Sequence, residues 1–151
     1  LASPTRPPAA GWRQLSWLPQ RPVLVPGTVR HNLVLLGPVD DLERACAAAG
    51  FDAVLDELPR GLDTVLGRGG VGLSLGQRQR LGLARALGSP AAVLLLDEPT
   101  AHLDARTEQH VLGAIVERAR AGATVLVVAH RQQVAAAGDR VVEVNSDGFR
   151  R

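Results

Sequence analysis

The 151-residue sequence contains no lysine and no methionine, and its 17 basic residues are all arginine. Without an initiator methionine, we expect this sequence to be a piece of a longer chain. Without lysine, no ammonium side chain is available to bind phosphate. The single cysteine, Cys46, excludes an internal disulfide and fits a reducing compartment. No apolar run approaches the ~20 residues of a membrane-spanning helix, and a formal net charge of +2 is too small to favour nucleic acid as a partner.

The residues that are present describe a globular α/β domain. Hydrophobic residues make up 46% of the chain and charged residues 21%, which is typical of a folded domain and not of a disordered one. Apolar strands alternate with helical patterns in the second half, which predicts a parallel sheet covered by helices on both faces. Residues 28–70 are mostly helical in pattern and look like an inserted lobe. Residues 1–11 are rich in proline and alanine and read as a linker or a truncation edge.

The boundaries follow from periodicity, capping residues and turn residues. We expect strands at 12–18, 92–96, 124–129 and 140–144, and helices within 28–36, 40–50, 51–58, 74–87, 104–120 and 132–137.

Polar side chains follow three of the predicted strands where each strand ends. Asp97 and Glu98 come directly after the strand at 92–96, His130 ends the next strand, and Gln20 follows the first. In parallel α/β sheets, ligands bind beyond the carboxyl ends of the strands. One carboxylate could join a metal shell while the other acts as a base beside a water. A lone acidic pair or a lone histidine is more often structural, but three polar strand ends together favour a site for nucleotide triphosphate chemistry.

The start of the central helix offers a second element of that site. Ser74 and Gln77 have the spacing of a capping box, and a helix N-terminus carries free N–H groups and a partial positive charge suited to phosphate. Gly76 in the first turn costs about 1 kcal/mol of helix stability relative to alanine, and its use would be close approach of the backbone to a ligand. An ordinary capped helix would need no ligand, so both interpretations stand.

With these residues placed, the sequence resembles the nucleotide-binding ATPase domain of an ATP-binding cassette (ABC) transporter. Five motifs occur in order over about residues 12–145: the Q-loop at Gln20, the signature motif at 73–77 (LSLGQ, usually LSGGQ), Walker B with its glutamate at 93–98, the D-loop at 101–104 and the H-loop at His130. The resemblance implies a P-loop NTPase-like parallel sheet, here partial, flanked by helices. It divides the chain into a helical lobe at 28–88 and a catalytic core at 12–27 and 89–145, within a partial domain at 12–151.

The resemblance also implies roles, cofactors and partners. The cofactors would be ATP and Mg²⁺, with Asp97 and Gln20 at the metal. Glu98 would polarise the attacking water, and His130 and Gln20 would contact the γ-phosphate region. Residues of the signature motif (Ser74, Gly76 and Gln77) would grip the γ-phosphate of ATP held by a second ABC ATPase domain, identical or not. Asp104 would communicate across that interface.

In the family, the helical lobe rests on a transmembrane domain at the cytoplasmic face of the bacterial cell membrane. No nucleic-acid partner is expected. The segments at 27–33 and 58–77 are similar to exporter-type cassettes. Within these cassettes, the run from 61 to 104 most resembles the cysteine/thiol exporter subunits of the cytochrome bd assembly type.

Three departures from the family pattern stand out. Leu75 replaces a usual glycine, and Ala101 with His102 replaces the common Ser-Ala of the D-loop. The third is the absence of a phosphate-binding P-loop, G-x-x-x-x-G-K-[ST]. The chain therefore looks like a domain without its first strands and helix, and we expect this piece alone neither to bind ATP tightly nor to hydrolyse it.

Two alternatives remain at this point. A DNA-maintenance ATPase of the structural-maintenance type shares the signature and Walker B, although such proteins interpose coiled coils and no heptad pattern is present. A non-catalytic interaction module could keep the fold without the chemistry.

Overall fold

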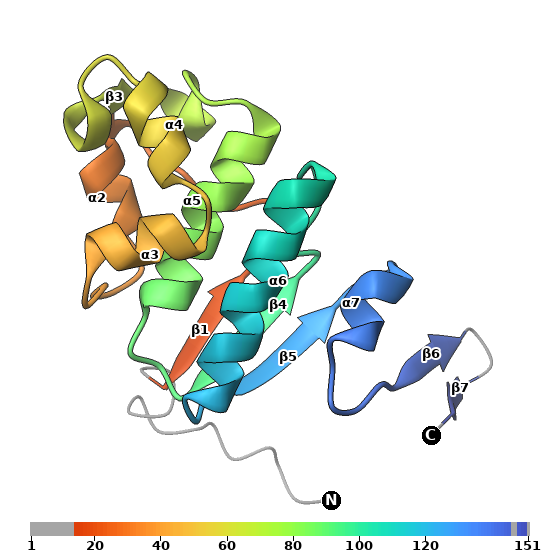
Figure 1. Ribbon diagram of the computed structural model, residues 1–151. Helices are drawn as coiled ribbons and strands as arrows, with labels where there is room; N and C mark the ends of the chain where they lie inside the picture. Colours follow the sequence, from red (N-terminus) through yellow and green to blue (C-terminus); the bar gives the residue numbers. More distant parts are fainter. Residues whose placement is uncertain (1–13, 146–147, 151) are drawn as a thin grey trace, which may run out of the picture.

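The computed structural model describes residues 14–145 and 148–150 of the chain (Figure 1). The expected linker at 1–11 and the first residues of the predicted strand at 12–18 lie outside the described residues.

A three-stranded parallel sheet forms the base of the structure. Its strands are β1 (Leu15–Leu18), β4 (Val93–Asp97) and β5 (Thr124–Val128), in the order β1-β4-β5. Leu18 pairs with Leu96, and Asp97 pairs with Val128, so the three strands end close to one another. The predicted parallel sheet is confirmed.

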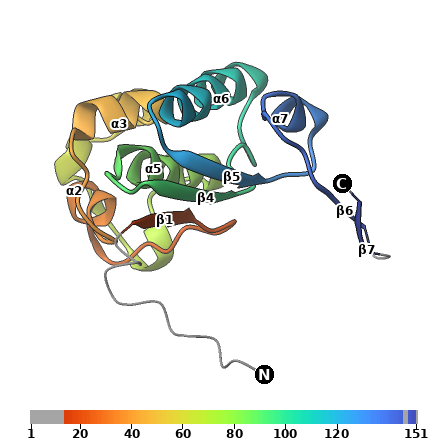
Figure 2. The ribbon, with the colours of Figure 1, turned by 90° about the horizontal axis from the view of Figure 1, so that it is seen from below.

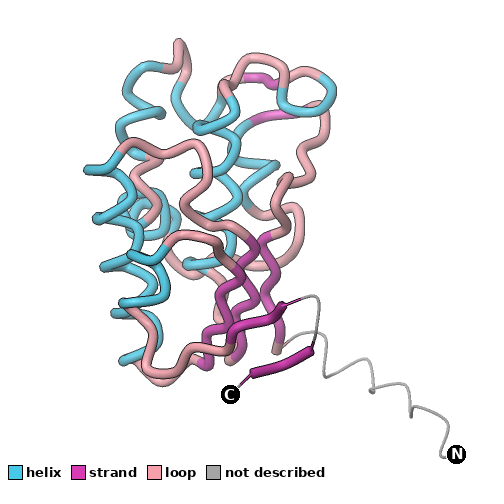
Figure 3. The backbone as a smooth tube through the Cα atoms, turned by 90° about the vertical axis from the view of Figure 1, so that its right-hand side faces the viewer, coloured by secondary structure: helices cyan, strands magenta, loops and turns pink. Residues whose placement is uncertain are grey.

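Among the described residues, helices cover only one face of this sheet. Leu18, Leu94 and Leu96 point into the core beneath the two long helices, α5 (Leu75–Gly88) and α6 (Ala105–Arg120), and are buried. On the opposite face the side chains of Trp17 and Leu126 are 57% and 59% exposed. Figure 2 shows α3 and α6 above the strands of this sheet, and Figure 3 shows those strands beside the long helices. The expectation of helices on both faces is therefore wrong for the described residues, because apolar strands alone do not say which faces are covered.

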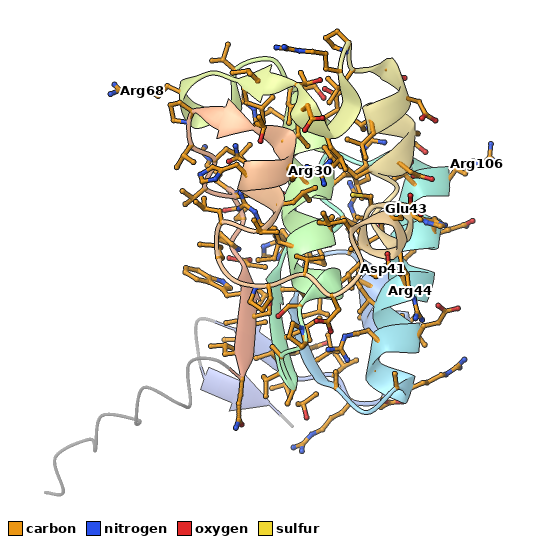
Figure 4. The ribbon with its side chains drawn as sticks, turned by 90° about the vertical axis from the view of Figure 1, so that its left-hand side faces the viewer. Arg30, Asp41, Glu43, Arg44, Arg68 and Arg106 are labelled. Atoms are coloured by element: carbon orange, nitrogen blue, oxygen red, sulfur yellow. The ribbon has the colours of Figure 1, made fainter. Side chains whose placement is uncertain are left out.

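The predicted helical lobe forms from short elements packed on α5. They are α2 (Val29–Leu33), α3 (Leu42–Ala48), α4 (Asp52–Glu57), two 3₁₀ turns (Gly61–Asp63 and Arg68–Gly70) and a small antiparallel pair, β2 (Gly27–Thr28) and β3 (Val65–Leu66). Thr28 caps α2 through a hydrogen bond from the N–H of His31, and Asp41 caps α3 through one from the N–H of Arg44. Figure 4 shows Asp41 and Arg44 at the exposed start of α3. Local capping chemistry thus decides where these helices begin.

One buried arginine ties this lobe to the segment that follows β1. Arg85, on α5, donates from Nε to the carbonyl of Asn32 and from Nη1 to the carbonyl of Val23, the latter at 2.7 Å. Asn32 is itself buried, and its side-chain amide bridges Val25 and Thr28. Hydrogen-bonded polar side chains therefore fill the junction between lobe and core, although Nη2 of Arg85 is buried without a partner in the described structure.

The end of the chain leaves the main sheet. After α7 (Gln132–Ala136), β6 (Glu143–Asn145) pairs antiparallel with β7 (Gly148–Arg150) as a separate two-stranded sheet. The predicted strand at 140–144 is therefore found later and with a different partner. No helix within residues 14–145 or 148–150 has both the length and the apolar character that crossing a membrane requires.

Candidate active site

The polar residues predicted at the strand ends meet at one edge of the sheet. Asp97 is the last residue of β4, His130 lies two residues after β5, and Gln20 lies two residues after β1. Asp97 is half-buried, while Gln20 and His130 are exposed. The parallel register brings all three strand ends to the same side, as the sequence indicated.

The side chains of Glu98 and His130 are in polar contact at this edge. Nε2 of His130 lies 3.1 Å from Oε1 of Glu98. The glutamate side chain is 16% exposed and the imidazole 91% exposed, so a mostly buried carboxylate meets a solvent-exposed imidazole. Oε1 lacks a partner with hydrogen-bond geometry in the described part of the chain, so a buried carboxylate oxygen remains able to accept a hydrogen bond.

The backbone of Glu98 has an unusual conformation that is fixed by three hydrogen bonds. Its φ is +50°, in the left-handed region that costs a non-glycine residue about 1–3 kcal/mol. Its N–H donates to the carbonyl of Val128 at 2.8 Å. Its own carbonyl accepts from the N–H of Ala101 at 3.0 Å and from Nε2 of Gln79 at 3.0 Å. These hydrogen bonds therefore fix the backbone position from which the Glu98 side chain extends.

The start of α5 has the predicted capping box. The N–H of Gln77 donates to Oγ of Ser74 at 3.2 Å, and the N–H of Ser74 donates to Oε1 of Gln77 at 2.9 Å. No partner is found for the N–H groups of Leu75 and Gly76 among the described residues. These two donors and the positive helix end can receive an anion from solvent.

Gly76 is closely packed against the chain's own D-loop. A Cβ at this position would lie 2.7 Å from the carbonyl oxygen of His102, a residue whose φ is +62°. The sequence led us to expect close approach to a ligand here, and the structure adds an internal reason for glycine. The start of α5 and the segment after Walker B are therefore in direct contact within one chain.

Asp104 begins α6 as its capping residue. Its carboxylate accepts from the N–H of Thr107 at 2.9 Å and from the hydroxyl of Thr107 at 2.8 Å. These hydrogen bonds hold the pKa of Asp104 below its usual value. The predicted cap is confirmed, and the side chain is already engaged within its own helix.

Two further residues at this edge were not singled out in the sequence. Arg131, directly after His130, donates from Nη1 to Oε2 of Glu108 at 2.7 Å, and Glu108 is buried on α6. Gln79, also buried, is the residue that holds the Glu98 carbonyl. Gln79 and Glu108 are polar residues on helices, and their burial distinguishes them from solvated positions, whereas Arg131 is an exposed residue directly before α7.

A family model described as ABC transporter matches residues 8–101 of the chain. The chain belongs to the ABC transporter family. The match covers the predicted Q-loop, signature and Walker B segments, from Gln20 through the whole of α5 to Asp97–Glu98, while most of the D-loop and His130 lie beyond it. The DNA-maintenance alternative is not favoured.

Three relatives of the chain are named for transport, secretion or lipid flipping. The chain is 42% identical over 141 residues to the glutathione/L-cysteine transport system ATP-binding/permease protein CydD of Escherichia coli, covering 91% of this chain and 24% of that protein. It is 41% identical over 133 residues to the cyclolysin secretion/processing ATP-binding protein CyaB of Bordetella pertussis, covering 86% of this chain and 18% of that protein. It is 43% identical over 123 residues to the ATP-dependent lipid A-core flippase of Pseudomonas aeruginosa, covering 79% of this chain and 20% of that protein.

A solved structure shares the fold. The structure of a bacterial Atm1-family ABC exporter with ATP bound superposes with a TM-score of 0.74 at 34% identity, covering 84% of this chain and 23% of that one. The ABC ATPase fold with its parallel sheet is thereby confirmed. The chain spans about a tenth to a quarter of the length of the curated relatives that it matches.

Proposed function

We propose that this chain is the part of an exporter-type ABC transporter that carries the hydrolytic glutamate for one ATP and the signature motif for another. The observation that carries this proposal is the Glu98–His130 contact at the shared edge of the three parallel strands. In domain terms, we assign residues 12–27 and 89–145 to the catalytic core and residues 28–88 to the helical lobe.

Asp97 and Gln20 are the residues that would hold Mg²⁺. Mg²⁺ takes oxygen ligands and is usually bound through one or two carboxylates, substrate phosphates and waters, not by an all-protein cage. In agreement with that preference, no group of three or more metal-ligating side chains is found in the described part of the chain. A single carboxylate at the end of β4, with an amide oxygen after β1, fits this donor set. When bound, the ion would neutralise charge on the phosphates.

Glu98 would orient and polarise the water that attacks the γ-phosphate. Its carboxylate is mostly shielded from solvent, and one of its oxygens has no hydrogen-bond partner in the described structure. That oxygen can therefore accept a hydrogen bond from the attacking water. His130, at 3.1 Å and largely exposed, can contact both the carboxylate and a phosphate oxygen. The bond from the γ-phosphorus to the bridging oxygen breaks as the water oxygen bonds to phosphorus, and the carboxylate accepts the water's proton.

Ser74, Gly76 and Gln77 would serve the ATP held by a second ABC ATPase domain. The free N–H groups at the start of α5, the Ser74 hydroxyl and the Gln77 amide donate to no other described residue and would form the anion-binding face. Asp104, at the start of α6 on the segment that contacts α5, would communicate across the interface. The other partner would be the transporter's transmembrane domain, which places the chain at the cytoplasmic face of a bacterial cell membrane.

For the cargo, we propose a cysteine- or glutathione-type thiol. The support is the likeness to CydD, which runs over 141 residues. Inverted membrane vesicles that contain the complete protein should accumulate labelled cysteine or glutathione when ATP is added. Uptake that does not depend on ATP would refute the thiol cargo without touching the ATPase proposal.

The test of the hydrolytic proposal is steady-state ATPase activity of the complete protein. Glu98→Gln should lower kcat by at least about a hundredfold, the usual contribution of a general base, while ATP binding is retained. Glu117→Gln is the matched control, because Glu117 is an exposed glutamate on the same chain's α6. An unchanged rate for Glu98→Gln would refute the proposal.

The 151-residue chain by itself should bind Mg·ATP only weakly. Its sequence holds no lysine for a P-loop, and its two anion-facing elements serve different nucleotides in the proposal. Micromolar binding in a calorimetric titration of this chain would contradict the division into two half-sites.

A further inference from the structure

Gln79 links the central helix to the glutamate of the candidate site. Its side chain is 2% exposed, and its Nε2 donates to the carbonyl of Glu98 at 3.0 Å. An amide is costly to bury unless it is hydrogen-bonded. Gln79 is one of two buried polar residues on α5, together with Arg85, and its buried amide therefore needs a hydrogen-bond partner. That partner is the backbone of the residue with the hydrolytic carboxylate.

The same face of α5 makes a second contact with the same segment. Gly76 lies one turn before Gln79, and residues three apart on a helix share a face. Gly76 abuts the carbonyl of His102, while Gln79 holds the carbonyl of Glu98. One helix face therefore supports both ends of the segment from 98 to 102.

That segment contains the strained backbone of the structure. Glu98 and His102 are the two non-glycine residues with positive φ in the described part of the chain, at +50° and +62°. Such conformations persist only where neighbours over-determine them. If the backbone of Glu98 relaxed from its positive φ, the direction of the Cα–Cβ bond of Glu98 would change. The carboxylate would move with that bond.

We propose that Gln79 is a positioning residue for the hydrolytic step, acting through the backbone of Glu98. The inference rests on the proposed function. By holding the Glu98 carbonyl, the amide keeps the carboxylate aimed at the attacking water. Because Gln79 lies on the helix whose start would meet the second nucleotide's phosphate, a shift of α5 changes the aim of Glu98 in the same chain.

A positioning role predicts a particular kinetic pattern in the complete protein. Gln79→Met keeps the approximate volume and removes the donor, and it should lower kcat for ATP hydrolysis about tenfold, the rate equivalent of one hydrogen bond. The KM for ATP should stay within about twofold, since the amide is buried and donates to the Glu98 carbonyl. Gln109→Met is the matched control, because Gln109 is an exposed glutamine on α6, and its kcat should equal that of the unmodified protein.

A second variant separates positioning from packing. Gln79→Ala removes the same donor but also leaves a cavity, so its Tm should fall further than that of Gln79→Met. The two variants should nevertheless share the same kcat. A kcat that follows Tm across the two variants would show a merely structural role and overturn the proposal.

A double-mutant cycle with Glu98→Gln provides the decisive comparison. If Gln79 acts through Glu98, adding Gln79→Met to Glu98→Gln should change the residual hydrolysis rate by less than about twofold. A further tenfold loss in that background would overturn the positioning role, as would an unmodified kcat for Gln79→Met alone. Full activity of Glu98→Gln by itself would instead refute the proposed function, so the two failures are distinguishable.

Discussion

Replacing Arg85 by methionine should destabilise the folded chain by about 2–4 kcal/mol. Arg85 is buried at the junction of the helical lobe and the core, where it donates to the carbonyls of Asn32 and Val23. Methionine fills much of the same volume and donates nothing. The two carbonyls would then lose their charged donor in a site that little water reaches.

The magnitude follows from two opposing contributions. Each hydrogen bond from a charged donor contributes about 1.5–3 kcal/mol, so two lost bonds cost about 3–6 kcal/mol. Part of this loss is offset, because Nη2 of Arg85 is buried without a partner in the described structure, and removing it relieves about 1–2 kcal/mol of desolvation. Subtracting the relieved desolvation from the lost hydrogen bonds leaves a net destabilisation of about 2–4 kcal/mol.

The effect should not depend on pH in the usual range. Burial lowers the pKa of Arg85 to about 10. Both folded and unfolded chains are therefore protonated at this residue between about pH 6 and about pH 9, and the contribution of Arg85 to stability is constant there. Only above about pH 10, where the folded chain loses the proton first, should this group make stability rise with pH.

Urea unfolding followed by circular dichroism measures this prediction, at low protein concentration and at two pH values in that range. Arg106→Met is the control, because Arg106 extends from the surface of α6 into solvent (Figure 4) and should stay within about 0.5 kcal/mol of the unmodified chain. A loss below about 1 kcal/mol for Arg85→Met would refute the view that the two carbonyls depend on this donor.

Three further predictions concern single positions. Gly76→Ala should lower Tm, because the added Cβ would meet the carbonyl of His102. Gly113→Ala has open space around it on α6 and should raise stability by about 0.5–1 kcal/mol. Equal effects of the two substitutions on the melting curves would contradict the close packing of Gly76. Asp104→Ala should be less stable than the unmodified chain above about pH 4, and the difference should close as acid protonates the carboxylate, because hydrogen bonds lower the pKa of Asp104 in the folded chain alone. Cys46 is buried with its pKa raised to about 11, so maleimide should label it at least about a hundredfold more slowly than in urea, and fast labelling of the folded chain would argue against that burial.

The features that the sequence predicted correctly are short in range. The capping box of Ser74 and Gln77 and the cap at Asp104 involve residues three apart, so the side-chain spacing alone determines them. The meeting of the strand ends at Asp97 and His130 followed from one rule about parallel sheets. These are cases where local chemistry and a general topological rule both point to one arrangement.

The features that it missed depend on contacts between distant segments. Gln79 and Glu98 are 19 positions apart, and nothing in the helical pattern separates a buried glutamine from an exposed one. The contact of Gly76 with the carbonyl of His102 depends on the positive φ of His102, which the residue type does not predict. The strand predicted at 140–144 had strand-like composition, but composition does not name a pairing partner, and β6 pairs outside the main sheet.

The uncovered face of the sheet bears on how stability measurements should be interpreted. Trp17 and Leu126 expose apolar surface in the folded state that a close-packed layer would otherwise remove from water. Any segment or partner that covers this face binds the folded state and not the unfolded one, and so it adds free energy by mass action. The Tm of the folded chain then depends on what covers this face as well as on the chain's own sequence. A substitution that is severe in the 151-residue chain can accordingly be mild where the face is covered.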